Sequence, residues 1–372
     1  MRINVNSIFK FLSSPKLFVC TIIWMMVLVF IGTIAQKDIG LYLAQQKYFS
    51  NWITWFWLLP MPGGRLVMLF MFINLGSLLF LPGLWSKNKV GILIVHLGAI
   101  LLLMGGGITA WFSFEGNMIL EEGSSSNYII NTQNIELTII NTTSSHYDAV
   151  TAFDNDILYQ GSKLNHDSLP FTLEILDFHT NCEPIKRAEP INSYHGLAKN
   201  FTLKPLKVEN DPQMNRAGIT FRIMGTDMNL DGVYSMFLGQ SVLQTLQIKE
   251  QKYSLLLRRE RIYLPFSIQL NDFKQVLHPG TEIAKSFSSD IFLIDNDISR
   301  RVLIQMNEPL RYKGYTFYQA SFSQSDSIET SILAVVKNYG RLFPYISSII
   351  MSIGLLIHLL MKLPKLIKKR VY

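Results

Sequence analysis

Residues 90–111 read VGILIVHLGAILLLMGGGITAW, an apolar run with no charged side chain. As a helix it is long enough to cross the roughly 30 Å hydrocarbon core of a bilayer. Three further runs of this kind occupy residues 17–35, 66–84 and 343–361. The four runs predict an integral membrane protein with four transmembrane α-helices, three near the N-terminus and one near the C-terminus.

The distribution of charge predicts how these helices are oriented. The 372 residues are 49% hydrophobic and 16% charged, which is too apolar for an average soluble protein, and the net charge is +7. Lys and Arg are concentrated in the leader 1–16, the turn 85–89 and the tail 362–372, whereas the loop 36–65 carries fewer. The positive-inside rule therefore places both termini in the cytoplasm. The charge requires no nucleic acid, and we expect the basic tail to lie on anionic lipid headgroups of the bilayer.

Between the third and fourth runs, residues 112–342 change to an alternating pattern typical of strands. The pattern indicates an all-β extracytoplasmic domain with β-branched and aromatic strands separated by Gly, Asn, Asp and Pro. Strands are predicted over residues 129–140, 171–178, 219–224, 253–257, 291–295, 302–306, 315–320 and 331–337. The polar stretches 181–199 and 207–216 are interpreted as loops.

Two of the apolar runs contain a histidine, His96 and His358. An ionisable side chain in lipid is costly and is a functional candidate for that reason. Counted from the cytoplasmic ends of their helices, the two imidazoles lie about 9 and 6 Å deep, which predicts nearly level positions. Two level imidazoles could ligate a haem iron. Alternatively, His96 simply hydrogen-bonds a backbone carbonyl of a neighbouring helix, and His358 is an interfacial residue that reaches water.

Other candidate sites are weaker. The outer histidines His146, His166, His179, His195 and His278 have no metal-ligand spacing and are interpreted as solvated loop residues. No nucleophile elbow, Walker sequence or zinc signature occurs, so no catalytic residue is assigned. Cys20 and Cys182 form no CxxC pair. The aromatic cluster 52–57 is either an interfacial belt or a ring-stacking surface for a flat ligand.

Several short runs resemble the ResB family of cytochrome c biogenesis proteins, also called CcsB. The most specific is residues 306–321, MNEPLRYKGYTFYQAS. The others are spread over nearly the whole chain: Ser14-Pro15-Lys16-Leu17, Leu59-Pro60, Pro62-Gly63-Gly64, Ile73-Asn74-Leu75, Val95-His96-Leu97-Gly98, Phe114-Glu115-Gly116-Asn117-Met118, Leu120-Glu121-Glu122-Gly123, Leu264-Pro265-Phe266, His278-Pro279-Gly280-Thr281 and Ala284-Lys285-Ser286-Phe287.

The resemblance implies a subunit of the complex that matures c-type cytochromes at the bacterial cytoplasmic membrane. Such a protein works with a ResC-type (CcsA-type) membrane partner and handles haem b as a transient cargo for attachment to the CxxCH of apocytochrome c. A thioredoxin-like reductant is implied only indirectly. His96 matches the histidine of the third span that is a proposed haem ligand in this family, whereas His358 is a candidate from its depth alone.

The resemblance leaves open whether the chain is an enzyme, since its implied place is within a haem–apocytochrome c ligase complex. Basic residues such as Lys87, Lys89 and Lys362 are expected at the mouth of a cytoplasmic-leaflet haem pocket. The alternative function is a scaffold without haem, in which the β domain docks the partner or the apocytochrome and His96 serves helix packing.

Overall fold

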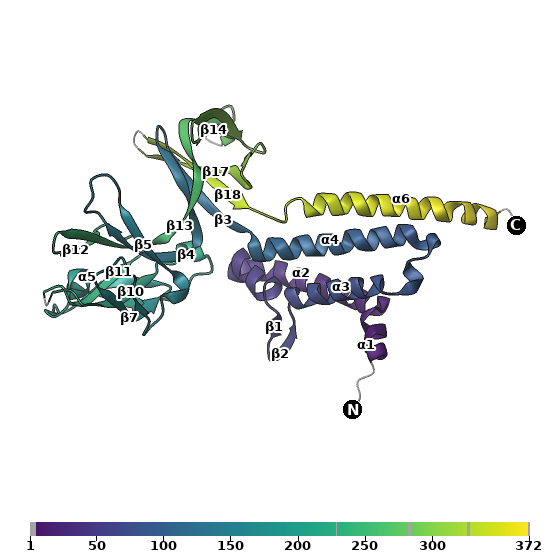
Figure 1. Ribbon diagram of the computed structural model, residues 1–372, viewed down its shortest axis with the longest axis horizontal. Helices are drawn as coiled ribbons and strands as arrows, with labels where there is room; N and C mark the ends of the chain where they lie inside the picture. The colour runs from purple at the N-terminus through teal and green to yellow at the C-terminus, as the bar shows by residue number, and fades with distance from the viewer. Residues whose placement is uncertain (1–4, 228, 282–283, 326–327, 371–372) are drawn as a thin grey trace. The chain divides into compact units, whose positions relative to one another are not determined.

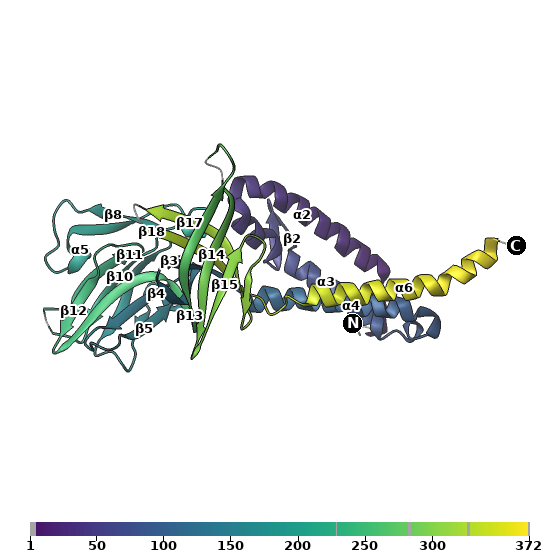
Figure 2. The same cartoon turned by 90° about the horizontal axis from the view of Figure 1, so that it is seen from above.

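The computed structural model describes the chain except residues 1–4, 228, 282–283, 326–327 and 371–372. It divides into two compact units, a helical unit of residues 1–114 with 337–372 and a β unit of residues 115–336 (Figures 1 and 2). The expected arrangement, with helices before and after an inserted β domain, is confirmed.

The helical unit contains α1 (Val5–Leu12), α2 (Pro15–Ala44), α3 (Gly64–Leu79), α4 (Val90–Phe112) and α6 (Phe343–Arg370). A π-helical turn, Gln45–Phe49, follows α2, and a hairpin of β1 (Ile53–Phe56) and β2 (Leu59–Pro62) precedes α3. Two 3₁₀ turns, Pro82–Leu84 and Lys87–Lys89, connect α3 to α4. Three of the apolar segments are long enough to cross a membrane: Pro15–Phe49, Lys87–Phe112 and Phe343–Leu363.

Two predicted spans differ from the helices observed. The run expected at 66–84 forms the 16-residue α3, which is only about 24 Å long. It ends at Leu79 because Pro82 and Gly83 cannot continue a regular helix. The first helix continues beyond residue 35 to Ala44, with a non-helical break at Gly40, where φ is 75°. Part of the predicted aromatic loop is therefore helix and hairpin.

Helices α4 and α6 pack as an antiparallel pair through small residues spaced seven apart (Figure 1). A Cβ atom added to Gly91 would lie 2.7 Å from the Gly354 carbonyl oxygen, and one added to Gly98 would lie 3.1 Å from the Ser347 carbonyl oxygen. Seven residues are close to two helical turns, so these positions share one face of each helix. Gly98 therefore allows the backbones of α4 and α6 to approach closely.

Asn74 joins α3 to the start of the chain. Its side chain is fully buried, and its Nδ2 atom donates to the carbonyl oxygens of Leu12, at 2.5 Å, and of Ser14, at 3.0 Å. These carbonyls lie where α1 ends and α2 begins, so a helix terminus obtains a hydrogen-bond donor that the backbone does not supply. The run 73–75 noted in the sequence therefore has a structural role in positioning the first helices.

The β unit contains two larger sheets. The first has the order β11-β10-β7-β6, and the second has the order β15-β14-β13-β4-β3-β18-β17-β16, with β12 on β13 and β5 on β4. The strands are β3 (Phe114–Glu121), β4 (Ser125–Asn141), β5 (Ala149–Asp154), β6 (Lys163–Leu164), β7 (Thr172–His179), β8 (Cys182–Lys186), β9 (Phe201–Pro205), β10 (Gly218–Met224), β11 (Gly232–Phe237), β12 (Gln244–Ile248), β13 (Gln251–Leu277), β14 (Ala284–Asp295), β15 (Ile298–Gln305), β16 (Leu310–Tyr312), β17 (Tyr315–Ser325) and β18 (Ile328–Lys337).

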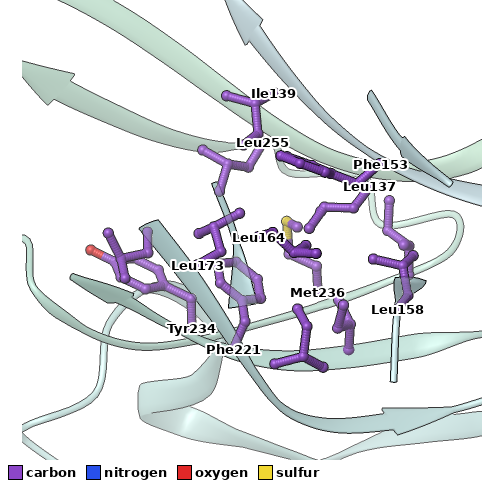
Figure 3. Packing of buried hydrophobic residues seen from close by; sticks show 14 of the residues in the cluster. Leu137, Ile139, Phe153, Leu158, Leu164, Leu173, Phe221, Tyr234, Met236 and Leu255 are labelled. Atoms are coloured by element: carbon purple, nitrogen blue, oxygen red, sulfur yellow. The ribbon is translucent and has the colours of Figure 1, made fainter. Parts of the chain in front are cut away.

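One hydrophobic core lies where the four-stranded sheet packs on one end of the larger sheet (Figure 3). Alternate residues of each strand point into it, among them Leu137, Phe153, Leu173, Phe221 and Leu255, as period-two patterning requires. Each of the eight predicted strands is present. The predicted loop 181–199 was partly wrong, because Cys182–Lys186 forms β8 and pairs with β9. Its Pro, Glu and Lys residues concealed this short two-stranded sheet.

Candidate functional site

His96 is half-buried on α4, and its ring orientation is fixed by its own helix. The Nδ1 atom lies 2.8 Å from the carbonyl oxygen of Ile92, one turn earlier. A carbonyl oxygen only accepts hydrogen bonds, so Nδ1 is the donor in this contact, and in a neutral ring the lone pair is then on Nε2. A neutral imidazole with Nδ1–H bound to a carbonyl is the usual form of a histidine that ligates a metal through Nε2. The residue therefore fits an axial ligand to haem iron.

His358 is half-buried on α6, on the face that contacts α4. Its backbone nitrogen would lie 2.5 Å from a Cβ atom added to Gly91. His96 is five residues beyond Gly91, which places it about 7.5 Å further along α4 and about 140° around the helix. The predicted level arrangement was therefore wrong, because the register of the two helices sets His358 beside Gly91. The structure does not bring the two imidazoles together.

An apolar pocket of about 300 Å³ lies between the start of α3 and the end of α4. Leu103 and Gly107, seven and eleven residues after His96 and on a similar face of α4, contribute to its lining, and Arg65 is at its rim. The expected haem pocket beside Lys87 and Lys89 would lie at the other end of the α3–α4 pair. Sequence reasoning missed this pocket, although Trp52 and the glycines 105–107 were visible signals for it.

The aromatic cluster 52–57 separates into three roles. Phe56 packs in the helical unit, with its ring 6.1 Å from that of Trp24 and 5.8 Å from that of Tyr48. Trp52 lines the apolar pocket. Trp57 is 99% exposed at the turn of the hairpin, with φ of 55°. Trp24 donates from Nε1 to the Pro62 carbonyl oxygen at 2.8 Å, which holds the hairpin against α2.

The run 306–321 is largely structural. Leu310 and Phe317 are buried in the β unit. Asp295 accepts hydrogen bonds from Lys313 and Tyr312, each at 2.5 Å. The hydrogen bond from Lys313, and next that from Tyr312, lowers the pKa of the Asp295 carboxyl. This specific sequence therefore fixes the turn between β16 and β17 and joins it to the end of β14.

The outer histidines do not form a metal site. No group of three or more His, Cys, Asp or Glu residues suited to a metal occurs in the described parts of the chain. His146, His166 and His278 are exposed, as predicted. The other two differ: His179 lies on β7 with Nε2 3.1 Å from Asp177, and His195 stacks on Tyr234 at 5.1 Å.

Cys182 is a buried residue of β8, only 1% exposed. Burial raises the pKa of its thiol to about 11, an effect that the positive charge of Arg216 partly offsets. A protonated, enclosed thiol is a poor nucleophile. The cysteine is therefore a packing residue of the β unit.

Comparison with known proteins identifies relatives of this chain. The model of the ResB-like family matches residues 85–204 and 223–336, which include α4 and most of the β unit. Protein NrfI of Wolinella succinogenes is 24% identical over 275 residues, which are 72% of this chain and 27% of that protein. The chain thus spans about a quarter of the length of this relative.

Proposed function

Because this chain belongs to the ResB-like family, we propose that it is a haem-handling subunit in cytochrome c biogenesis. In this proposal it works at the cytoplasmic membrane with a ResC-type (CcsA-type) partner, and haem is the cargo that is attached to the CxxCH of apocytochrome c. Both termini are cytoplasmic and the β unit is outside. The chain binds and orients its cargo, and bond formation belongs to the whole complex.

The observation that supports this proposal is the orientation of the His96 ring. Its half-buried ring is fixed by the 2.8 Å contact of Nδ1 with Ile92, which directs the free lone pair of Nε2 away from its own backbone. No described residue supplies a hydrogen-bond partner for Nε2. In a helix as apolar as α4, a neutral imidazole avoids the cost of placing charge in lipid and is ready to ligate iron.

In this proposal His358 is not the second axial ligand. His358 faces α4 beside Gly91, whereas His96 points about 140° away from that face. One iron atom cannot contact both rings while α4 and α6 remain packed in this register. In this proposal His96 is the iron ligand of this subunit, and His358 does not contact the iron.

The experiment is absorption spectroscopy of the chain purified with its membrane partner from haem-replete membranes. We expect a Soret band that is shifted or lost in His96→Ala and is recovered on addition of free imidazole, which can occupy the vacated coordination position. The matched control is His358→Ala, which removes an imidazole from the other helix and should leave the spectrum unchanged.

Two outcomes would contradict the assignment. A spectrum that is the same in wild type and His96→Ala would remove His96 as a ligand. An absence of haem from the wild-type complex, together with normal binding of apocytochrome, would favour the alternative function, a scaffold in which the β unit docks other proteins.

A further inference from the structure

The apolar pocket at the start of α3 has a lining that differs sharply from one end to the other. Its walls are hydrophobic side chains from both helices, including Phe72 of α3 and Leu103 and Trp111 of α4. Its charged lining residue is Arg65, in the first turn of α3. All of these residues belong to the helical unit, so the pocket is a property of that unit alone. A ligand for it must combine an apolar body with a group that suits a cation.

Arg65 lacks a compensating charge. Among the residues that the structure describes, no carboxylate forms an ion pair with its half-buried guanidinium. The N-terminal end of α3 adds partial positive charge at the same place. The backbone there is firmly held, because a Cβ atom on Gly64 would lie 2.8 Å from both Cα and the carbonyl oxygen of Phe49. The start of α3 that carries Arg65 is therefore held in place, and its positive charge attracts an anion.

The apolar part of the pocket is long and open at its side. The lining on α4 extends from Leu103 to Phe112, about 14 Å along the helix axis. Met68 and Met104 are 38% and 42% exposed, so the groove communicates with the lipid-facing surface. Gly107 keeps it wide, because a Cβ atom there would meet nothing closer than a Trp111 ring carbon at 3.8 Å. A flexible hydrocarbon chain suits this shape.

We propose that this groove binds an acidic phospholipid, with one acyl chain along α4 and the phosphate group against Arg65. An unpaired cation at the end of an apolar groove selects an anionic headgroup over a zwitterionic one. Trp52 and Trp111 lie at the same end of the pocket, and indole rings favour the headgroup zone of a bilayer. No imidazole lines the groove, which distinguishes it from the surroundings of His96. His96 lies seven residues before Leu103, the first lining residue on α4, so the proposed iron ligand is about 10 Å along the helix from the start of the groove.

Native mass spectrometry of the purified chain tests this proposal, with phosphatidylglycerol and phosphatidylcholine titrated separately. Wild-type protein should retain phosphatidylglycerol about fivefold more tightly, the contribution of a single arginine near a membrane surface. Arg65→Gln should abolish that preference. Lys47→Gln is the matched control, because it removes an exposed cation of the π-helical turn without altering the groove, and it should keep the preference.

A second pair of variants tests occupancy of the groove. Gly107→Leu should fill it and weaken binding of both lipids, whereas Gly106→Leu should not, because Gly106 faces open space and is not part of the lining. Equal effects of the two leucines, or loss of the preference in Lys47→Gln, would overturn the proposal. Binding of iron protoporphyrin in place of either lipid would also overturn it. These readouts do not depend on the spectrum of His96→Ala, so the two proposals can fail separately.

Discussion

Gly91 is the position where one added methyl group most directly tests the packing of α4 on α6. A Cβ atom at Gly91 would lie 2.5 Å from the backbone nitrogen of His358 and 2.7 Å from the carbonyl oxygen of Gly354. Comfortable contacts of carbon begin at roughly 3.5 Å, so Gly91→Ala must push α6 back by about 1 Å. Both obstructing atoms belong to the backbone, and no change of rotamer can relieve the overlap.

The expected loss of stability in Gly91→Ala is the result of two opposing effects. Overpacking a well-packed interface costs about 1 to 3 kcal/mol, whereas replacing glycine by alanine within a helix returns about 1 kcal/mol. Gly106 on the same helix supplies the control, because a Cβ atom there has nothing within 4 Å. Gly106→Ala therefore gains helix stability without any overlap between the helices. We expect Gly91→Ala to be less stable than Gly106→Ala by about 1 to 3 kcal/mol.

Thermal unfolding of both variants in the same detergent measures this difference. Gly98→Ala should fall between them, because its closest obstruction is the flexible Met351 side chain, with Cγ at 2.6 Å. If Gly91→Ala unfolded at the same temperature as Gly106→Ala, or higher, the glycines would not be needed for close approach, and the helix register used to separate His96 from His358 would be wrong.

Three further predictions concern the β unit. Glu136 and Arg258 form a buried ion pair at 2.7 Å. Glu136→Gln should therefore lower the free energy of unfolding, measured with urea, by about 3 kcal/mol. The double variant Glu136→Gln with Arg258→Met should recover part of this loss. Hydrogen bonds from Arg301 lower the pKa of the Asp290 carboxyl below 3.8, so the ionised carboxylate stabilises the fold above that pH, and this stabilisation is lost as the pH falls below it. The difference in stability between wild type and Asp290→Asn should therefore shrink in acid. A constant difference from pH 7 to pH 3 would contradict this. With a pKa of about 11, only about one Cys182 thiol in ten thousand is ionised at pH 7. Cys182 should therefore resist iodoacetamide until the protein unfolds. Rapid alkylation of the folded protein would exclude a buried thiol.

The architecture was predictable because its signals are local. Length and absence of charge identified the apolar runs, and alternation identified the strands that form the cores of both sheets. The errors occur where local signals compete. Helix α2 continues past Lys37 and Asp38 to Ala44 with a break at Gly40, since neither charge stops a helix, and α3 is cut short by Pro82. Both boundaries depend on backbone chemistry that hydropathy does not measure.

The candidate site was only partly predictable, because it depends on which faces of the helices meet. Depth along a helix can be counted from sequence, and this count selected His96 and His358 together. Direction around the helix axis cannot be judged until the partner helix and its register are known. The pocket at Arg65 was missed for the same reason, since its residues come from two helices and from Trp52, far apart in sequence.

The missing register was nevertheless present in the chain as a pattern of small residues. Glycines at 91, 98 and 105 repeat every seven positions, and Gly340, Ser347 and Gly354 repeat with the same spacing. In the structure these small residues face each other, and the antiparallel direction pairs Gly91 with Gly354 and Gly98 with Ser347. That alignment by itself turns His96 away from α6. The packing that brings these two helices together therefore leaves the imidazole of α4 outside the contact between α4 and α6.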